Sequence, residues 1–255
     1  MHPIRLKLFA DTADLAGMLR FYRHPLVSGF TTNPTLMRKA GISNYEAFGR
    51  MVLEEIPDKP VSFEVLAEDA SEIEDQARAI ASWGPNTFVK ITVTDRRGQS
   101  LLPTIHRLSA SGIQLNVTAL FTLEQIASIL PMLNPAQPAI LSVFAGRIAD
   151  TGRDPIPVLR AARAMLYNFP NVELLWASPR EVFNLFQAQE AGCHIITMPP
   201  ELIDKLAHLG KDLDAFTLET IESFYRDAEA CGGKFTSSPQ PLAHSRLRPR
   251  SMPCP

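Results

Sequence analysis

The sequence has few cysteines and no apolar run that approaches the length of a membrane span. Its three cysteines, Cys193, Cys231 and Cys254, show no C-x-x-C spacing and leave an odd count. This pattern favours free thiols in a reducing compartment over a disulfide framework. The first residues also lack the charged and apolar regions of a signal peptide. We therefore expect a soluble, cytoplasmic protein.

An excess of one charge sign is also missing. The chain of 255 residues has 25 lysines and arginines against 27 aspartates and glutamates, which gives a formal net charge of -2. This balance gives no indication of a nucleic acid or an anionic membrane as partner. A hydrophobic content of 45% and a charged content of 20% are ordinary for a globular protein. The length allows one large single-core domain or two small ones.

The sequence does contain a regular alternation of eight short apolar segments with longer amphipathic segments. The predicted strands are Leu6–Asp11, Gly29–Asn33, Val61–Ala67, Thr87–Val93, Gln114–Phe121, Ala139–Arg147, Val172–Ser178 and Cys193–Met198. The predicted helices are Asp14–Arg23, Asn44–Glu55, Ser71–Ser82, Ser100–Ala110, Leu123–Leu133, Ile156–Asn168, Arg180–Ala191, Pro200–Leu206 and a final Phe216–Ala230. Capping-box spacing marks two helix starts, at Ser71 with Glu74 and at Thr122 with Gln125.

This order of elements predicts an α/β fold, a single (β/α)8 TIM barrel with a C-terminal helix. An open doubly wound sheet is the alternative, but it would usually carry a glycine-rich phosphate turn after the first strand. Neither G-x-G-x-x-G nor a Walker loop is present. Thr236–Pro255 contains five prolines, three arginines and no acidic residue, which is typical of a disordered segment. We expect the barrel in residues 1–235 and a disordered tail in residues 236–255.

One lysine stands in the middle of a predicted buried strand. Thr87–Val93 is rich in β-branched residues, follows a Gly-Pro-Asn turn and carries Lys90 at its centre. Because burial disfavours the ammonium form, such a lysine is expected to become a neutral amine, which can form a Schiff base with a carbonyl substrate. Two alternatives remain open. Lys90 could pair with a core carboxylate, or its side chain could extend off the end of the strand.

The alternation of side chains along each strand places further polar residues on the same face as Lys90. Barrel strands point alternate side chains inward, and catalytic groups lie toward the carboxyl ends of the strands. The inward phase then contains Phe9, Asp11, Thr31, Asn33, Ser62, Glu64, Phe88, Thr92, Asn116, Thr118, Ser142, Phe144, Trp176, Ser178 and Arg180. Such a polar lumen is costly unless its members are hydrogen-bonded, and it differs from the usual aliphatic filling of a barrel.

Several of these residues have a purely structural alternative. Asp11, Asn33 before Pro34, and Ser178 before Pro179 could each cap a following helix, with Glu181 completing a capping box after Ser178. Asn116 and Thr118 could bond each other. Glu64 lies between two apolar neighbours and needs a partner, for which Lys90 on the next strand is the obvious candidate.

The motifs around these residues resemble the transaldolase family. They are Phe9-Ala10-Asp11-Thr12-Ala13-Asp14, Gly29-Phe30-Thr31-Thr32-Asn33-Pro34, Val89-Lys90-Ile91, Leu115-Asn116-Val117-Thr118-Ala119-Leu120-Phe121, Ser142-Val143-Phe144-Ala145-Gly146-Arg147 and Ala177-Ser178-Pro179-Arg180. The resemblance runs in order from about Leu6 to the final helix. The fold of this family is a (β/α)8 barrel whose Schiff-base lysine lies on the fourth strand, where Lys90 falls.

The resemblance implies a mechanism and a set of site residues. Lys90 would form the Schiff base with a phosphorylated ketose, and Asp11 would take the proton of the C4 hydroxyl. Glu64 and Thr118 would hold a water that serves the proton transfers. The predicted substrate-binding residues are Asn33, Asn116 and Ser142 for the three-carbon unit, Arg147, Ser178 and Arg180 for the phosphate, and Phe144. The resemblance implies no metal or organic cofactor, phosphorylated sugars as substrates, and a homo-oligomer.

Three functional alternatives stay open at this point. Fructose-6-phosphate aldolases of the same family release dihydroxyacetone, but they have Gln where Glu64 stands and Tyr where Phe144 stands, so the sequence favours transfer. A transaldolase that builds an unusual sugar phosphate would use the same residues. A non-catalytic sugar-phosphate-binding barrel is the third alternative. Transaldolases typically have Ser-Pro-Phe at Ser142-Val143-Phe144 and Ser-Phe-Arg at Ser178-Pro179-Arg180, which puts the substrate's chain length in question.

Overall fold

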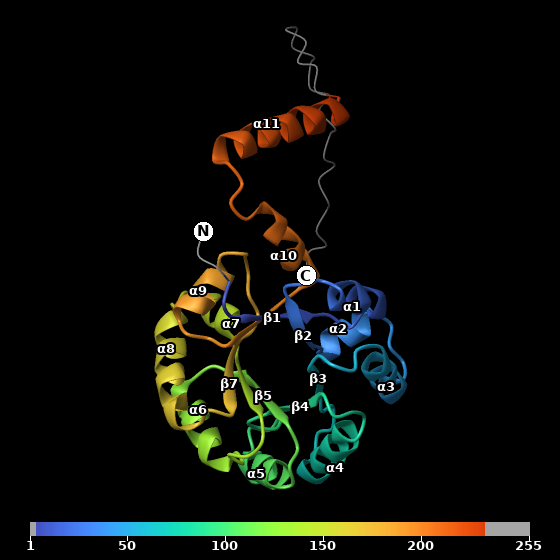
Figure 1. The fold of residues 1–255 in the computed structure, drawn as a ribbon, viewed down its shortest axis with the longest axis vertical. Helices are drawn as coiled ribbons and strands as arrows, with labels where there is room; N and C mark the ends of the chain where they lie inside the picture. Colours follow the sequence, from blue (N-terminus) through green and yellow to red (C-terminus); the bar gives the residue numbers. More distant parts are fainter. Residues whose placement is uncertain (1–3, 233–255) are drawn as a thin grey trace, which may run out of the picture. The chain divides into compact units, whose positions relative to one another are not determined.

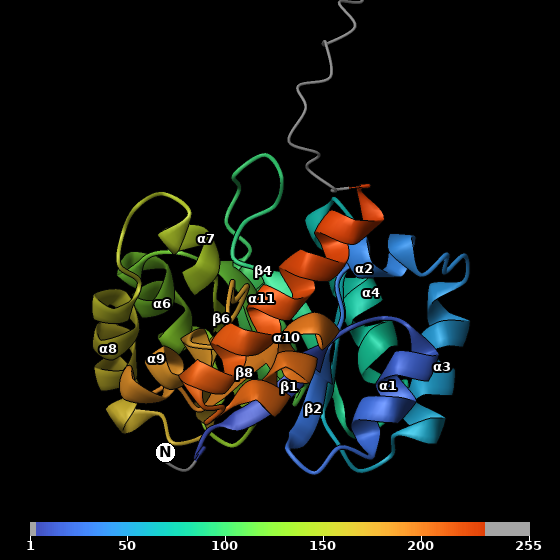
Figure 2. The ribbon, with the colours of Figure 1, turned by 90° about the horizontal axis from the view of Figure 1, so that it is seen from above.

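Eight parallel strands close into a barrel in the order of the sequence, β1 to β8. Their bounds are Lys7–Asp11, Val27–Thr31, Val61–Glu64, Thr87–Thr92, Leu115–Leu120, Ala139–Val143, Val172–Trp176 and Ile195–Met198. In the computed structural model, which describes residues 4–232, helices surround the strands (Figure 1). The turned view of Figure 2 also places the strands between α6 and α8 on one side and α1 and α3 on the other. The predicted (β/α)8 barrel is confirmed.

The helices of the barrel follow the predicted segments, with two additions. They are α1 (Leu15–Tyr22), α2 (Pro34–Lys39), α3 (Tyr45–Glu55), α4 (Ala70–Ala81), α5 (Leu102–Ala110), α6 (Leu123–Ile129), α7 (Ala145–Ala149), α8 (Ile156–Met165), α9 (Asn184–Glu190) and α10 (Pro200–Asp204). Short 3-10 turns cover Leu130–Met132, Leu166–Asn168 and Lys205–His208. The sequence did not predict α2 or α7.

The helix α7 corrects the predicted strand Ala139–Arg147, which ends at Val143 instead. After Val143 the chain leaves the sheet, and the Phe144 backbone N–H donates to the carbonyl of Leu120 on β5. The next residues are small and form the first turn of α7, where Gly146 lies against the chain that follows β7. The apolar run in the sequence therefore continued past the end of the strand into a buried helix, which periodicity cannot distinguish over so few residues.

One of the two predicted capping boxes is correct. At the start of α6, Thr122 accepts from the Gln125 backbone and the Gln125 side chain accepts from the Thr122 backbone. The box predicted at Ser71 is wrong, because α4 begins before that residue and no side chain caps it. Glu74 instead accepts from Arg78 and Arg107, both at 2.7 Å.

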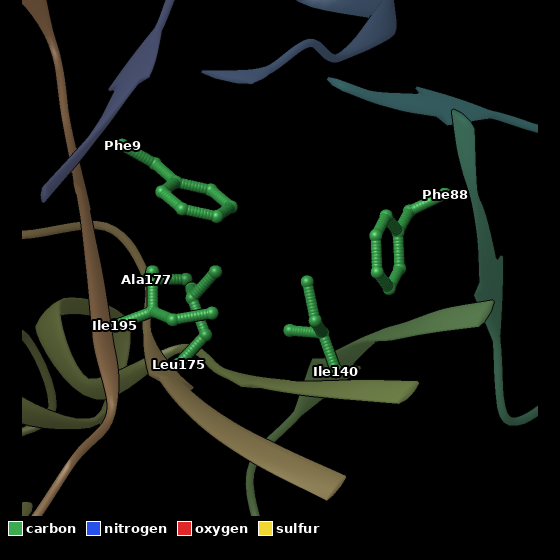
Figure 3. Close-up of a cluster of buried hydrophobic side chains, with 6 residues drawn as sticks. All are labelled: Phe9, Phe88, Ile140, Leu175, Ala177 and Ile195. Carbon is green, nitrogen blue, oxygen red and sulfur yellow. The ribbon is translucent and has the colours of Figure 1, made fainter. Parts of the chain in front are cut away.

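An apolar layer closes the lumen below the polar residues. Phe9, Phe88, Ile140, Leu175, Ala177 and Ile195 form a buried cluster to which five strands or their ends contribute (Figure 3). Phe9 precedes Asp11 by two positions and Phe88 precedes Lys90 by two, so each strand carries an apolar inward residue and then a polar one.

The inward phase predicted for β7 is wrong. Leu175 and Ala177 belong to the lumen cluster, whereas the prediction had placed Trp176 inward. The register explains the difference, since Leu175 lies beside Ser142 on β6 and beside Ile195 on β8. Neighbouring residues in a parallel sheet point to the same face, so Trp176 faces the opposite side of the sheet.

The chain divides into two units, Met1–Ala207 and His208–Pro255. In the second unit, α11 (Leu213–Ala230) is capped by Asp212, whose side chain accepts from the Ala215 backbone at 2.9 Å. This helix confirms the predicted C-terminal helix and begins somewhat earlier. None of the helices within residues 4–232 has the length and apolar composition needed to cross a membrane. The tail predicted for residues 236–255 lies outside the described residues.

Candidate functional site

A cavity of about 460 Å³ opens at the carboxyl ends of the barrel strands. It is lined by Asp11, Thr31, Asn33, Pro34, Thr35, Leu36, Glu64, Lys90, Thr118, Ala119, Ser142, Phe144, Arg147, Ala177, Ser178 and Thr197. This set contains all the predicted site residues except Asn116 and Arg180. Most of the side chains that the sequence assigned to one lumen therefore meet in one cavity.

Lys90 lies in the wall of this cavity with a carboxylate beside it. Its Nζ is 3.2 Å from Glu64 Oε2 and donates to the backbone carbonyl of Thr32 at 2.8 Å. The side chain of Lys90 is only 7% exposed, and β3 and β4 pair so that Glu64 and Lys90 are direct neighbours. The alternative that Lys90 pairs with a core carboxylate is thus correct as geometry. It does not exclude chemistry, because Nζ also faces a cavity that a substrate could enter.

Asp11 is the second carboxylate at this cavity. Thr31 Oγ1 donates to its Oδ1 at 2.7 Å, and Asn33 Nδ2 approaches its Oδ2 at 3.5 Å. Burial raises the pKa of Asp11, while the positive charge of Lys90 and the bonds from Thr31 and Asn33 oppose that rise. A carboxylate with a raised pKa in a cavity is suited to take and return a proton.

The capping alternatives separate cleanly. Asp11 is not a cap, because Asp14 caps α1 by accepting from Gly17 N at 2.8 Å. Asn33 does cap α2 through Leu36 N at 3.0 Å, and it reaches Asp11 with its other side-chain atom. Ser178 is not a cap, since α9 begins several residues later.

Asn116 lies beneath the cavity rather than in its wall. Its Nδ2 donates to Ser62 Oγ at 3.0 Å, and its Oδ1 accepts from Ser142 Oγ at 2.6 Å. All three side chains are buried, so this network ties β3, β5 and β6 together and orients the Ser142 hydroxyl. A direct contact between Asn116 and substrate stays a prediction.

A β-bulge in β5 shapes the wall next to Lys90. The pairing of β5 with β6 shifts register between Val117 and Leu120, and Ala119 has a φ of 57°. Bulges redirect side chains next to active sites. Here Thr118 and Ala119 both line the cavity, although the strand alternation that places Thr118 inward would point Ala119 outward. Within residues 4–232, the buried Thr118 hydroxyl has no hydrogen-bond partner. The alternative bond between Asn116 and Thr118 is therefore wrong.

The predicted phosphate-binding residues are only partly brought together. Arg147 and Ser178 line the cavity, and the Arg147 guanidinium lies 5.2 Å from the centre of the Phe144 ring. Arg180 instead makes a two-pronged ion pair with Asp150, with Nε 3.1 Å from Oδ1. Its predicted contact with a phosphate stays a prediction.

Thr197 on β8 is a cavity residue that the sequence analysis missed. Its Oγ1 is 2.5 Å from Thr31 Oγ1, and it is only 5% exposed. The signal was present, because Thr197 follows the inward Ile195 by two positions near the carboxyl end of a predicted strand. Among the residues that the structure describes, no three His, Cys, Asp or Glu side chains form a group able to hold a metal ion.

Comparison with known proteins identifies the family. The model of the family described as Transaldolase/Fructose-6-phosphate aldolase matches residues 8–237. The chain belongs to this family. Among its transaldolase relatives, "Probable transaldolase 2" of Listeria monocytogenes is 36% identical over 231 residues, covering 90% of this chain and 99% of the relative. The "Probable transaldolase" of Dehalococcoides mccartyi is 34% identical over 200 residues, covering 78% of this chain and 88% of the relative.

A solved structure of a Burkholderia cenocepacia protein supports the fold alone. It has a TM-score of 0.53 at 12% sequence identity and covers 88% of this chain and 93% of its own. Membership in the transaldolase and fructose-6-phosphate aldolase family supports an enzyme of the transferase class. The motifs that suggested the family lie on the strands that build the cavity.

Proposed function

We propose that the chain is a transaldolase that transfers a three-carbon dihydroxyacetone unit from a ketose phosphate to an aldose phosphate through a Schiff base on Lys90. Sedoheptulose 7-phosphate and fructose 6-phosphate are suitable donors. The observation that carries the proposal is the position of Lys90. Its buried amine lies beside Glu64 and lines the same cavity as Asp11. No membrane or nucleic acid takes part in this reaction.

The first step joins the lysine to the ketose. The Lys90 amine attacks the C2 carbonyl, water leaves, and an iminium forms that can accept the electrons of the C3–C4 bond. The Glu64 carboxylate beside Nζ supports this step, because it can take protons from the attacking amine. The Thr118 hydroxyl, unpaired within residues 4–232, is available to a water or substrate oxygen in the same wall.

The second step breaks the bond between C3 and C4. Asp11 takes the proton of the C4 hydroxyl as an aldose phosphate leaves, and the bonding electrons stay on the lysine-bound three-carbon enamine. When an aldehyde acceptor binds, the enamine attacks it and Asp11 returns the proton to the new hydroxyl. The raised pKa of Asp11 supports both directions of this transfer.

The charged end of the substrate belongs at the rim of the cavity. Arg147 is the cationic lining residue there, and its planar guanidinium suits the oxygens of a phosphate. Asn33 and Ser142 would bind the hydroxyls of the three-carbon unit from β2 and β6. We also propose a homo-oligomeric state and a cytoplasmic location, the latter because the three cysteines leave an odd count and show no C-x-x-C spacing.

Reductive trapping tests the Schiff base. Borohydride added with fructose 6-phosphate is expected to attach a three-carbon or six-carbon adduct to Lys90, found by mass spectrometry of the digested protein. Lys90→Met, which keeps the length of the side chain but removes the amine, is expected to give no adduct and no transfer. Lys39→Met, in α2 and exposed, is the matched control. An adduct on another lysine, or none, would reject the mechanism.

Dependence on the acceptor separates transfer from cleavage. With fructose 6-phosphate alone, a transferase is expected to release little free dihydroxyacetone, and addition of erythrose 4-phosphate is expected to start turnover. Glu64→Gln should raise the ratio of cleavage to transfer about fivefold, the change in rate that corresponds to the free energy of one hydrogen bond. Rapid release of dihydroxyacetone by the unmodified protein would assign it instead to the aldolase branch.

A further inference from the structure

Two threonine hydroxyls form a chain that ends on Asp11. Thr31 on β2 donates to Asp11 Oδ1 at 2.7 Å, and Thr31 lies 2.5 Å from Thr197 on β8. Thr31 and Thr197 are 2% and 5% exposed, so water does not compete freely for either hydroxyl. Because β2 and β8 flank β1 on its two sides, the chain crosses over the strand that carries Asp11.

The directions of these bonds follow from counting hydrogens. A hydroxyl has one hydrogen to donate, and an ionised carboxylate can only accept. Thr31 must therefore give its hydrogen to Asp11, and Thr197 must give its hydrogen to Thr31. Donors arranged head to tail polarise one another, so the second hydroxyl strengthens the bond that the first makes to the carboxylate.

The two oxygens of Asp11 are consequently unequal. Oδ1 holds the short bond from Thr31, whereas the one hydrogen-bond donor to Oδ2 among residues 4–232 is Asn33 at 3.5 Å. A bond of that length is weak, so Oδ2 keeps lone pairs free for a proton from outside. The arrangement fixes the carboxylate by one oxygen and leaves the other to react.

We propose that Thr197 is a positioning residue for the proton transfer by Asp11: it commits the Thr31 hydrogen to Oδ1 and leaves Oδ2 as the oxygen that exchanges the substrate proton. This inference rests on the proposed function, since it assigns a helper to the acid–base group of that reaction. Thr197 acts through Thr31 and has no role in the Schiff base on Lys90.

Other charged groups also act on the pKa of Asp11, in addition to the two threonines. Lys90 on β4 favours its ionised form, and Glu64 on β3 opposes it. Burial raises the pKa of Asp11, and the bond from Thr31 lowers it. Loss of the Thr197 donor therefore weakens one of the few interactions that keep the carboxylate ionised, without altering either charged neighbour.

Thr197→Val is the direct test, because valine keeps the shape of threonine and removes only the hydroxyl. We expect kcat of the transfer reaction to fall about fivefold at little change in KM, as for one lost hydrogen bond. The acid limb of the kcat profile is expected to move to higher pH by roughly half a unit. Thr197→Ser retains the hydroxyl and is expected to keep the profile of the unmodified enzyme.

Thr87→Val is the matched control. Thr87 is also a buried strand threonine, 3% exposed, and within residues 4–232 its hydroxyl has no hydrogen-bond partner to lose. The same substitution there is expected to leave both kcat and the acid limb unchanged. A Thr197→Val variant that behaves like Thr87→Val would overturn the inference, and so would a lower kcat with an unmoved acid limb, which would indicate a packing defect.

A double-mutant cycle tests the path through Thr31. If Thr197 works only through that hydroxyl, Thr31→Val and the double variant should have the same kcat, whereas additive losses would reject the relay. Failure of the proposed function is distinguishable from failure of this inference. In the first case the unmodified protein gives no lysine adduct and no transfer, and in the second it gives both while the threonine variants do not differ from the control.

Discussion

Lys90 and Asp11 line one cavity, but their charges are compensated to different extents by neighbouring groups. Lys90 has compensation close by, from the Glu64 carboxylate at 3.2 Å and the Thr32 carbonyl at 2.8 Å. Within the described part of the chain, the hydrogen-bond donors to Asp11 are a hydroxyl and an amide, and burial is the largest influence on the pKa of Asp11. Asp11, the residue proposed to take and return a proton, is thus the one whose ionised form is disfavoured by burial. A raised pKa of this kind suits a group that acts in acid–base catalysis.

Asp11 should therefore reduce the stability of the fold at neutral pH. Its folded pKa lies above the unfolded value, so the native state binds the proton more tightly than the unfolded chain. Stability from this group is present at low pH and is lost as pH rises from the unfolded pKa through the folded one. Asp11→Asn is expected to raise Tm at pH 7 by about 2–4 °C, corresponding to about 1 kcal/mol, while abolishing transfer.

Scanning calorimetry at two pH values checks this sign. The gain in Tm should shrink as pH falls through the folded pKa, and it should vanish well below the ordinary value of 3.8, where the carboxyl of the unmodified protein is protonated in both states. Asparagine can still accept from Thr31, so the short bond at 2.7 Å need not be lost. A variant that melts lower than the unmodified protein at pH 7 would show that the ionised carboxylate stabilises the barrel.

At the scale of elements, the site depends on one close contact between α7 and the end of β7. A Cβ on Gly146 would overlap the backbone carbonyl oxygen of Ser178. Ser178 itself has a φ of 61°, in the left-handed region. The glycine thus lets the chain after β7 pass directly over the start of α7, which brings Ser178 and Arg147 to the same rim of the cavity.

Gly146→Ala is expected to move Ser178 and Arg147 apart at the rim of the cavity. Because the obstacle is backbone, relief requires movement of the turn at Ser178, and we expect a loss of about 1–3 kcal/mol in the free energy of unfolding. KM for phosphorylated substrates should rise by about tenfold, equivalent to 1.4 kcal/mol of binding. Urea unfolding and steady-state kinetics measure the two effects.

Gly152→Ala is the control for that prediction. Gly152 follows the same helix, has a φ of 77° and has open space around its Cβ position. Alanine there should cost about 1 kcal/mol of backbone strain and leave KM unchanged. Equal changes in KM for both variants would show that the close contact at Gly146 does not support the phosphate end of the site.

At the scale of the whole molecule, the boundary between the barrel and the C-terminal segment stays a prediction that a deletion can test. The match spans residues 8–237, and the proline-rich, arginine-containing composition begins at Thr236. Deletion of residues 236–255 is expected to leave kcat/KM within twofold and Tm within about 2 °C, since a change of 1 kcal/mol would already shift Tm by that much. A larger loss in either measurement would assign the tail a role in the barrel or in assembly.

How much the sequence could predict differs between the barrel and its site. Strand number and order followed from hydrophobic alternation, and the phase of β1, β3 and β4 placed Asp11, Glu64 and Lys90 correctly. The inward or outward direction predicted from alternation within one strand is wrong where the register between strands or a bulge changes it, as at Trp176 and Ala119. Arg180 shows a third kind of limit, because its partner Asp150 directly follows α7, a helix that the sequence did not predict.

The sequence by itself determined the fold, the family and the residue types gathered on one face of the strands. Periodicity of two fixes which side chains share a face, and motif spacing fixes which strand carries each of them. The tertiary structure alone decided which of those groups touch. It paired Lys90 with Glu64, placed Asn116 beneath the cavity and joined Thr197 to Asp11 through Thr31. Those contacts depend on strand register, which arises from packing between elements far apart in the chain.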